Sequence, residues 1–437
     1  MKNKENRNFN VLDINYKISC EGLNFIRKQY FSASLLSLLS GIAKTFIVCI
    51  NIFKFRPNYS FKRFHKTEYA FWCLTRNNIR ALQPIQKRLD NSTLFEYDDL
   101  PWRAIYLKAL FYVYKVLCLY FKNNGYLKNA IASNFHTYCL SYAYIPASYT
   151  IHSKTTPLIN VFANDHTNIH RALFRVSEKL GIKTAYLQHA SVTAYFPPLE
   201  FDYAFLDGME SFEKYIKNKP CKSTVFLSGA SRFDYQIKNR ISQQNCNSYK
   251  IGIAVNILDQ KEKVVELVKH LVSMRYDCVL RPHPGQSIIE WKEIAEQLNC
   301  EFSLSTKENP LDFIANADIF IAGTSSIHLD VAIMGKQSFY FNFTNQDVYD
   351  HYGYLQNNLI TDISNVPLNS LSDLFIQNFD RTQIIRYYVA NYATKYWGKA
   401  SDIIAQTLYE LVNNKKYPEF WVEKERNGIN YLVLNET

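Results

Sequence analysis

The nine cysteines of this 437-residue chain include no C-x-x-C pair and are scattered from Cys20 to Cys300. Their number is odd and several lie in apolar runs, which favours reduced structural cysteines in a cytoplasmic compartment over a disulfide or zinc framework. The first ten residues, MKNKENRNFN, are polar and do not form a secretory signal. No Asp-x-Asp motif stands at a position suited to a metal ion, so no metal is expected.

Glycine and proline are also scarce, at 13 residues each, and there is no low-complexity tract or internal repeat. Hydrophobic residues make up 47% of the chain and charged residues 20%, which is typical of a folded globular protein and excludes a disordered one. A chain of this length exceeds one ordinary hydrophobic core. We therefore expect two domains, with three as the upper limit.

Positive charge is concentrated in the first third. Residues 1–150 contain 21 Lys and Arg against 8 Asp and Glu, a net charge of +13, whereas the remainder contains 29 against 31, a net charge of −2. Such a block favours an anionic partner, which could be lipid headgroups, a polyanionic polymer or nucleic acid. Because the block contains no recognisable nucleic-acid-binding motif, we expect contact with an anionic membrane surface and no nucleic-acid partner.

Two apolar segments lie within this basic third. Residues 31–53 are about long enough to span a bilayer, but Lys44 and several serines interrupt them, so a buried helix and an interfacial helix remain alternatives. In residues 101–122, Lys108, Lys115 and Lys122 recur every seven positions among aromatic side chains. On one helix they would form a basic stripe, which fits either an interfacial helix or a core helix whose lysines reach water.

From about residue 157, short apolar runs alternate with amphipathic segments of helix length, which predicts parallel sheets covered by helices. The alternation stops in the polar residues 232–250, interpreted as an interdomain linker, and then restarts. We predict an α/β fold with two Rossmann-like domains facing a cleft. The expected divisions are a basic, mainly helical region (1–150), the rest of an N-terminal α/β domain on the acceptor side (151–240), a C-terminal α/β domain on the nucleotide side (248–380) and C-terminal helices (381–437).

Ligands of such sheets bind beyond the carboxyl ends of the strands, and one strand end is rich in hydroxyls. The strand that ends at Gly323 is followed by Thr324, Ser325 and Ser326. A helix start with free N–H groups and hydroxyls suits a phosphate, and Asp330, one turn later, could accept a hydrogen bond from a sugar hydroxyl. The alternative is an ordinary N-cap followed by a first-turn acidic residue.

A second strand ends in the run Arg281-Pro282-His283-Pro284. Prolines on both sides of His283 restrict the backbone, so the imidazole has a fixed direction at the strand end. It could donate to a phosphate or pack against a nucleobase, with Arg281 adding positive charge. The alternative is a turn that contains a histidine without a functional role.

A third strand ends at Gln188-His189. His189 is a candidate general base for deprotonating an acceptor hydroxyl, with a hydrogen-bonded structural histidine as the alternative. Asp165, at the end of the preceding strand, is a competing candidate base.

Taken in chain order, these motifs and the later Gly335-Lys336 resemble the GT-B glycosyltransferase superfamily. The resemblance covers residues 157–345. It is to the branch that contains the CDP-glycerol glycerophosphotransferases of teichoic acid synthesis, bacterial polysialyltransferases and capsule Kdo transferases.

This resemblance implies roles for the individual residues. His283 and Pro284 would hold the nucleotide of a cytidine-activated donor, Thr324, Ser325 and Ser326 would hold its phosphates, and His189 would activate the acceptor. The donor is a substrate, so no cofactor is implied. Ala190 stands where relatives have glycine, so the backbone at this position must avoid a positive φ.

The expected function is transfer of a sugar from a CMP- or CDP-type donor, with UDP possible, to a growing bacterial surface glycan such as capsule or lipopolysaccharide. The acceptor would be a glycan or a lipid-linked molecule, and the enzyme would be cytoplasmic and peripheral on the inner face of the membrane. Three alternatives remain: a polyol-phosphate transferase, a nucleotide-sugar 2-epimerase, and a non-catalytic scaffold of a polysaccharide assembly complex.

Overall fold

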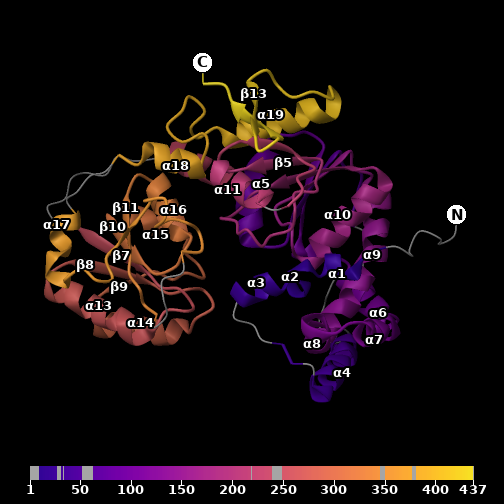
Figure 1. The fold of residues 1–437 in the computed structure, drawn as a ribbon, viewed down its shortest axis with the longest axis horizontal. Coiled ribbons are helices and arrows are strands. Elements are labelled where there is room, and N and C mark those ends of the chain that lie inside the picture. Colours follow the sequence, from indigo (N-terminus) through magenta and orange to yellow (C-terminus); the bar gives the residue numbers. More distant parts are fainter. Residues whose placement is uncertain are drawn as a thin grey trace. The chain divides into compact units, whose positions relative to one another are not determined.

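The computed structural model describes residues 9–26, 31–32, 34–51, 63–217, 219–238, 249–344, 350–375 and 380–436. The chain divides into two compact units (Figure 1). Unit 1 comprises residues 1–207, 211–232 and 399–437, and unit 2 comprises residues 208–210 and 233–398. Each unit contains one sheet, which confirms the predicted α/β fold. Within the expected linker, residues 239–248 lie outside the described residues.

Unit 1 is built on an eight-stranded sheet in the order β13-β14-β6-β5-β4-β3-β1-β2. Its strands are β1 (Tyr69–Cys73), β2 (Ser92–Glu96), β3 (Ile159–Phe162), β4 (Lys183–Leu187), β5 (Tyr203–Leu206), β6 (Thr224–Leu227), β13 (Trp421–Arg426) and β14 (Ile429–Leu434). Neighbouring strands are parallel except for the antiparallel pair β13 and β14. The central strand β3 is buried along its whole length, as expected for a parallel sheet covered on both faces.

Both ends of the chain contribute strands that the sequence interpretation assigned to helical regions. Strands β1 and β2 lie in the basic first third, and most of the other elements there are helices. Residues 381–437 contain helices, but they also form the β13–β14 hairpin. Its turn is Asn427-Gly428, and φ is +53° and +74° at these two residues, as a two-residue type I′ turn requires.

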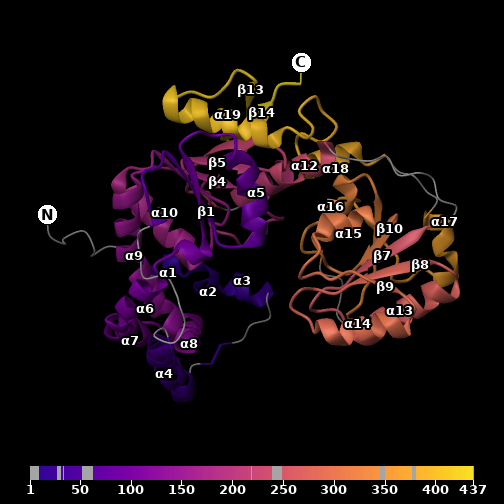
Figure 2. The same ribbon diagram turned by 180° about the vertical axis from the view of Figure 1, so that it is seen from behind.

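The helices of unit 1 surround the sheet and extend from it at one end (Figures 1 and 2). They are α1 (Val11–Ile14), α2 (Tyr16–Ser19), α3 (Glu21–Ile26), α4 (Leu35–Asn51), α5 (Arg76–Gln86), α6 (Trp102–Leu110), α7 (Val113–Lys122), α8 (Gly125–Ser133), α9 (Phe135–Thr155), α10 (Asn168–Leu180), α11 (Met209–Ile216) and α19 (Ala400–Asn413). Helix α4 packs on α6, α8 and α9, so these helices form a layer of their own beside the sheet.

The segment 101–122 forms two helices, not one. Helices α6 and α7 are separated at Phe111 and Tyr112 and are bent by 59° relative to each other. Lys108 therefore lies on a different helix from Lys115 and Lys122, and the predicted single basic stripe does not form. In the described part of the chain, no single helix has the length and apolar character needed to cross a bilayer, although the α6–α7 pair passes this test jointly.

Unit 2 contains a six-stranded sheet in the order β12-β11-β10-β7-β8-β9, with parallel neighbours. Its strands are β7 (Lys250–Ala254), β8 (Asp277–Arg281), β9 (Glu301–Phe302), β10 (Ile319–Ala322), β11 (Gln337–Tyr340) and β12 (Thr361–Asp362). Its helices are α12 (Asp234–Lys238), α13 (Lys261–Ser273), α14 (Ile288–Gln297), α15 (Pro310–Ala315), α16 (Ile327–Ile333), α17 (Leu371–Phe375) and α18 (Thr382–Tyr388).

Candidate functional site

The strand order of unit 2 creates a topological switch point between β7 and β10. From β7 the chain moves through β8 to β9 at one edge of the sheet, and it then returns to β10 on the other side of β7. The loops that follow β7 and β10 therefore diverge at the carboxyl edge, which is where open α/β sheets bind ligands. The nucleotide-binding residues predicted from the sequence lie at the end of β8, in the loops after β8 and β10, or in the first turn of α16.

Hydrogen bonds join the loops after β7, β8 and β10. The Asn256 Nδ2 donates to the Thr324 carbonyl at 2.7 Å, and the Gln286 Nε2 donates to the Asn256 carbonyl at 3.2 Å. The Asn256 backbone N–H donates to the Asp259 carboxylate at 2.6 Å, and the His283 backbone N–H donates to the Gln286 Oε1 at 2.9 Å. Asn256 thus holds the three loops in one arrangement.

His283 is exposed and has a fixed orientation in this loop cluster. The Gly285 backbone N–H donates to its Nδ1 at 3.0 Å. In the neutral ring the proton therefore lies on Nε2, which is left to donate to a ligand. Partial burial lowers the pKa of His283 below its ordinary value. Pro284 is exposed beside the ring, whereas Pro282 is buried.

The Asp259 carboxylate lies so close to Gly323 that a larger residue at position 323 would clash with it. A Cβ atom added at position 323 would lie 2.7 Å from the Asp259 Oδ1, so no larger residue fits without displacing the carboxylate. Burial raises the pKa of Asp259 to about 6. An acidic group whose charge changes at about pH 6 therefore lies beside the predicted phosphate loop.

The hydroxyl-bearing residues after Gly323 are partly accessible. Thr324 and Ser325 are half-buried and Ser326 is exposed. The Ser325 Oγ accepts a hydrogen bond from the Ile327 N–H at 3.4 Å, whereas the N-cap residue Ser326 makes no side-chain capping hydrogen bond. Asp330 is half-buried on α16, as its predicted place one turn into the helix requires.

Arg281, which was predicted to add positive charge beside a nucleotide, is bonded within unit 2. Its guanidinium is buried, donates to the Ser303 Oγ at 2.6 Å and to the Glu308 carbonyl at 3.0 Å, and lies over the Phe313 ring. The last residue of β8 points into the unit because side chains alternate along a strand. We therefore assign Arg281 to the structure of this loop and not to a nucleotide.

His328, Lys336 and Gly335 make further structural contributions near these loops. His328 is buried, its Nε2 lies 3.0 Å from the Gly323 carbonyl, and its Nδ1 contacts the Ser338 hydroxyl. Burial lowers the pKa of His328 to about 4, so the ring is neutral at neutral pH. Lys336 donates to the carbonyls of Ile314 and Ala315 at 2.7 and 3.1 Å and so caps the end of α15. Gly335, with φ of +70°, ends α16.

In unit 1, the loop after β3 carries a buried polar chain. The Asp165 Oδ1 lies 2.7 Å from the His166 Nδ1, and the Asp165 Oδ2 accepts a hydrogen bond from the Tyr215 hydroxyl at 2.7 Å. Asp165 is 2% exposed. Burial alone would raise the pKa of Asp165, but the hydrogen bonds from His166 and Tyr215 and the charge of Arg171 hold it below the ordinary value.

His189 lies in the neighbouring loop after β4. Gln188 fixes this loop by donating to the Ala190 carbonyl at 3.0 Å and accepting from the Asp207 N–H at 2.9 Å. Ala190 has a negative φ, as its Cβ atom requires. Burial lowers the pKa of His189 to about 4, and nearby His166 adds to this effect. The Nδ1 of His189 is buried without a hydrogen-bond partner.

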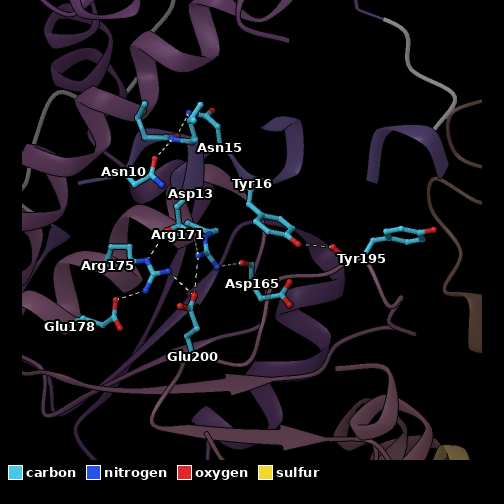
Figure 3. A network of polar contacts seen from close by, with 12 residues as sticks. Asn10, Asp13, Asn15, Tyr16, Asp165, Arg171, Arg175, Glu178, Tyr195 and Glu200 are labelled. Atoms are coloured by element: carbon cyan, nitrogen blue, oxygen red, sulfur yellow. Dashed lines mark hydrogen bonds and ion pairs between the residues drawn. The ribbon is translucent and has the colours of Figure 1, made fainter. Parts of the chain in front are cut away.

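Behind Asp165 lies a network of arginine and acidic side chains (Figure 3). Arg171 donates from Nη1 to the Asp165 carbonyl at 3.1 Å, and its Nη2 contacts Asp13 and lies 3.3 Å from Glu200. Arg175 donates to Asp13 and Glu200, at 2.6 Å in each case. The network therefore ties the N-terminal helix α1 to α10 and to the loop that carries Asp165.

Within the residues that the structure describes, no three His, Cys, Asp or Glu side chains gather as a metal site would require.

No protein-family model matches this sequence, and no curated protein matches it either. Solved structures do match. The UDP-GlcNAc 2-epimerase of Neisseria meningitidis, determined with UDP-GlcNAc, superimposes with a TM-score of 0.50 at 13% sequence identity, over 79% of this chain and 100% of the epimerase. The fold is the GT-B fold. The predicted resemblance to this superfamily is thus confirmed for the fold.

Two further GT-B structures match at lower similarity. The wall teichoic acid polymerase TagF has a TM-score of 0.46 and 11% identity, over 93% of this chain and 99% of the polymerase. MurG of Acinetobacter baumannii has a TM-score of 0.40 and 11% identity, over 80% of this chain and 99% of MurG.

Four polar residues of these GT-B units were not predicted as site residues: His166, Asn256, Asp259 and His328. His166 adjoins Asp165 in the motif NDHT, Asn256 lies within the predicted strand 250–258, and Asp259 follows that strand, so these three positions carried a sequence signal. His328 lies on the buried face of α16, and its contact with the Gly323 carbonyl depends on tertiary packing.

Proposed function

We propose that the protein is a glycosyltransferase that moves a sugar from a nucleotide-activated donor to a bacterial surface glycan such as capsule or lipopolysaccharide. The observation that carries this proposal is the loop cluster at the switch point of unit 2, where Asn256 joins the loops after β7, β8 and β10. A CMP- or CDP-type donor is favoured, UDP remains possible, and neither a cofactor nor a metal is required.

The donor would be held by residues of the loop cluster and of the start of α16. The Nε2–H of His283 donates to a phosphate, and Pro284 flanks the nucleotide. Thr324, Ser325 and Ser326 supply hydroxyls to the diphosphate. Asp330 accepts a hydrogen bond from a hydroxyl group of the sugar or ribose. Arg281 is not part of this set, because its guanidinium is bonded within the unit.

A thermal-shift series with CMP, CDP, UMP, UDP and GDP tests the donor class. We expect cytidine nucleotides to raise the melting temperature most, because a ligand that binds only the folded state stabilises it. His283→Ala should weaken nucleotide binding by about 10- to 100-fold, since a hydrogen bond to a charged group is lost.

His65→Ala is the control, because His65 is an exposed histidine of unit 1. It should bind nucleotides like the unsubstituted protein. The absence of any nucleotide response in the unsubstituted protein would contradict the proposal.

Three alternatives to glycosyl transfer use the same site differently. A polyol-phosphate transferase would release CMP from CDP-glycerol, a 2-epimerase would invert a UDP-sugar without an acceptor, and a scaffold would convert no donor. Incubating the protein with each donor, with and without acceptor glycan, and analysing the products distinguishes them. The epimerase is the second candidate, because a structure of that class has the same fold.

The acceptor side of the proposal concerns helix α4. Its buried residues recur at a spacing of three or four (Leu38, Gly41, Thr45 and Cys49), so only a narrow stripe packs on the neighbouring helices. The opposite side exposes large apolar residues: Leu35, Leu36, Leu39, Phe46, Ile47 and Ile50. An apolar area of this kind marks an interaction surface.

The charge around α4 favours an anionic lipid bilayer as the partner. The sequence contains no acidic residue between Glu21 and Glu68 or between Asp99 and Asp165. Helix α7 carries Lys115 and Lys122 and exposed aromatic residues, and it lies at the same end of unit 1 as α4 (Figures 1 and 2). We therefore propose that α4 and α7 contact an anionic membrane surface, which would place a cytoplasmic enzyme beside lipid-linked acceptors.

Co-sedimentation with vesicles tests this contact. The protein should bind phosphatidylglycerol vesicles at least tenfold more tightly than phosphatidylcholine vesicles, and Leu36→Glu/Ile47→Glu should reduce binding by at least about tenfold. Ile289→Glu is the matched control, because Ile289 is 74% exposed on unit 2. If the α4 variant instead dissociates a dimer and leaves vesicle binding unchanged, the surface binds a second copy and the membrane proposal is wrong.

A further inference from the structure

The chain of contacts through Tyr215, Asp165 and His166 has the organisation of a general-base relay. Tyr215 donates to one carboxylate oxygen of Asp165 and His166 contacts the other, at 2.7 Å in both cases. The loop after β3 carries Asp165 and His166 at the carboxyl edge of the sheet of unit 1. This is the edge at which parallel sheets bind ligands.

Asp165 itself cannot serve as the base. It is 2% exposed, and both of its carboxylate oxygens are already hydrogen-bonded. An acceptor hydroxyl would have to displace His166 or Tyr215 to reach it. Asp165 is therefore placed to orient another group and to stabilise positive charge on it.

His166 is the group that Asp165 orients. Because the carboxylate accepts from Nδ1–H, the neutral imidazole carries its lone pair on Nε2. Nε2 makes no hydrogen bond to the described residues, and the His166 side chain is 8% exposed. The ring packs against Phe196 with a centroid distance of 4.5 Å, and the His166 backbone N–H donates to the Asn164 Oδ1 at 3.1 Å.

His189, the base suggested by the resemblance, is placed less well. Its ring is hydrogen-bonded to the Ala163 backbone, and its Nδ1 has neither a partner nor contact with solvent. An acceptor hydroxyl cannot meet a nitrogen that is closed off in this way. His189 is thus better suited to shape the loop beside His166 than to take the proton.

We propose that His166 is the catalytic base of the transfer reaction and that Asp165 and Tyr215 are its positioning residues. The inference rests on the proposed function. His166 Nε2 takes the proton of the acceptor O–H, and the acceptor oxygen uses its electron pair to form a bond to the anomeric carbon of the donor. The bond between that carbon and the donor phosphate breaks, and its electron pair leaves with the nucleotide.

Steady-state transfer kinetics on the full chain test the assignment. His166→Asn should lower kcat by about 100-fold or more, with KM for donor and acceptor and the nucleotide affinity within about twofold, because a general base acts only in the chemical step. His189→Asn should retain most of kcat.

A matched pair of tyrosine variants tests the relay without removing a ring. Tyr215→Phe deletes the hydroxyl that contacts Asp165 and should lower kcat by about tenfold at unchanged KM. Tyr186→Phe deletes a hydroxyl that contacts Tyr215 but not the carboxylate and should leave kcat unchanged. If His166→Asn does not fold, this pair of variants still tests whether Tyr215 and Asp165 position His166 for catalysis.

Retention of more than a tenth of kcat by His166→Asn, together with a 100-fold loss in His189→Asn, would overturn the assignment. Equal effects of Tyr215→Phe and Tyr186→Phe would overturn the relay. Failure of the proposed function is distinguishable, because the unsubstituted protein would then bind no nucleotide and transfer no sugar.

Discussion

Arg171→Met is expected to lower the free energy of unfolding of unit 1 by about 3 kcal/mol, because it removes the buried guanidinium that pairs with the half-buried Asp13 and Glu200. Arg171 is 2% exposed, contacts Asp13 and Glu200, and donates to the Asp165 carbonyl (Figure 3). Arg175 also pairs with Asp13 and Glu200, so each carboxylate keeps one ion-pair partner in the variant. Urea unfolding followed by circular dichroism measures the change.

Arg88→Met is the matched control for this prediction. Arg88 pairs with Asp402 at the surface of unit 1, where its side chain is 32% exposed. Such a pair contributes within about 1 kcal/mol. If the two variants unfold at the same urea concentration, the buried network of Arg171 does not stabilise unit 1 as we infer.

Nucleotide binding to unit 2 is expected to strengthen as the pH falls through about 6, the value to which burial raises the pKa of Asp259. Above this pH, Asp259 is negatively charged beside Gly323 and repels a phosphate; below it, the carboxyl group is neutral. A ligand that binds only the neutral form loses up to about 100-fold in affinity between pH 5 and pH 8.

Calorimetric titration with a nucleoside diphosphate sugar measures this dependence, since both of its phosphates are esterified and do not titrate in this range. Protonation of His283 at low pH acts in the same direction, because it adds positive charge. Asp259→Asn should therefore leave only the contribution of His283, and Asp259→Asn/His283→Asn should bind equally at all pH values. An affinity of the unsubstituted protein that is constant from pH 5.5 to pH 8 would contradict the prediction.

The two sheets could be predicted because buried parallel strands are short apolar runs separated by amphipathic helices. Strand β8 ends at Arg281, the first residue of the run in which a strand end was predicted, and β10 ends at Ala322, one residue before the predicted end at Gly323. The strands β1 and β2 were not predicted, because the charge and aromatic content of the first third concealed two short runs. The β13–β14 hairpin did have a local signal, the Asn427-Gly428 turn between two strand-like segments.

The strand ends that carry the candidate site could be predicted, but the contacts between its side chains and loops could not. His283, Ser325 and Asp165 were predicted as site residues because each follows the end of a strand. The order of strands and helices in the sequence defines the carboxyl edge of a parallel sheet. The direction of a side chain at that edge depends on the pleat, which is why Arg281 points inward. Contacts between loops, such as that of Asn256 with Thr324, require the order of strands in the sheet, which a single sequence does not contain.

The return of residues 399–437 to unit 1 affects the order in which the protein folds during synthesis. Strand β14 pairs with β6, yet more than two hundred residues separate them along the chain, including all of β7 to β12. On the ribosome, unit 2 can thus be complete while β6 still has one unpaired edge. An apolar edge of this kind favours aggregation until it is covered, so we expect nascent chains that lack the last forty or so residues to depend on chaperones.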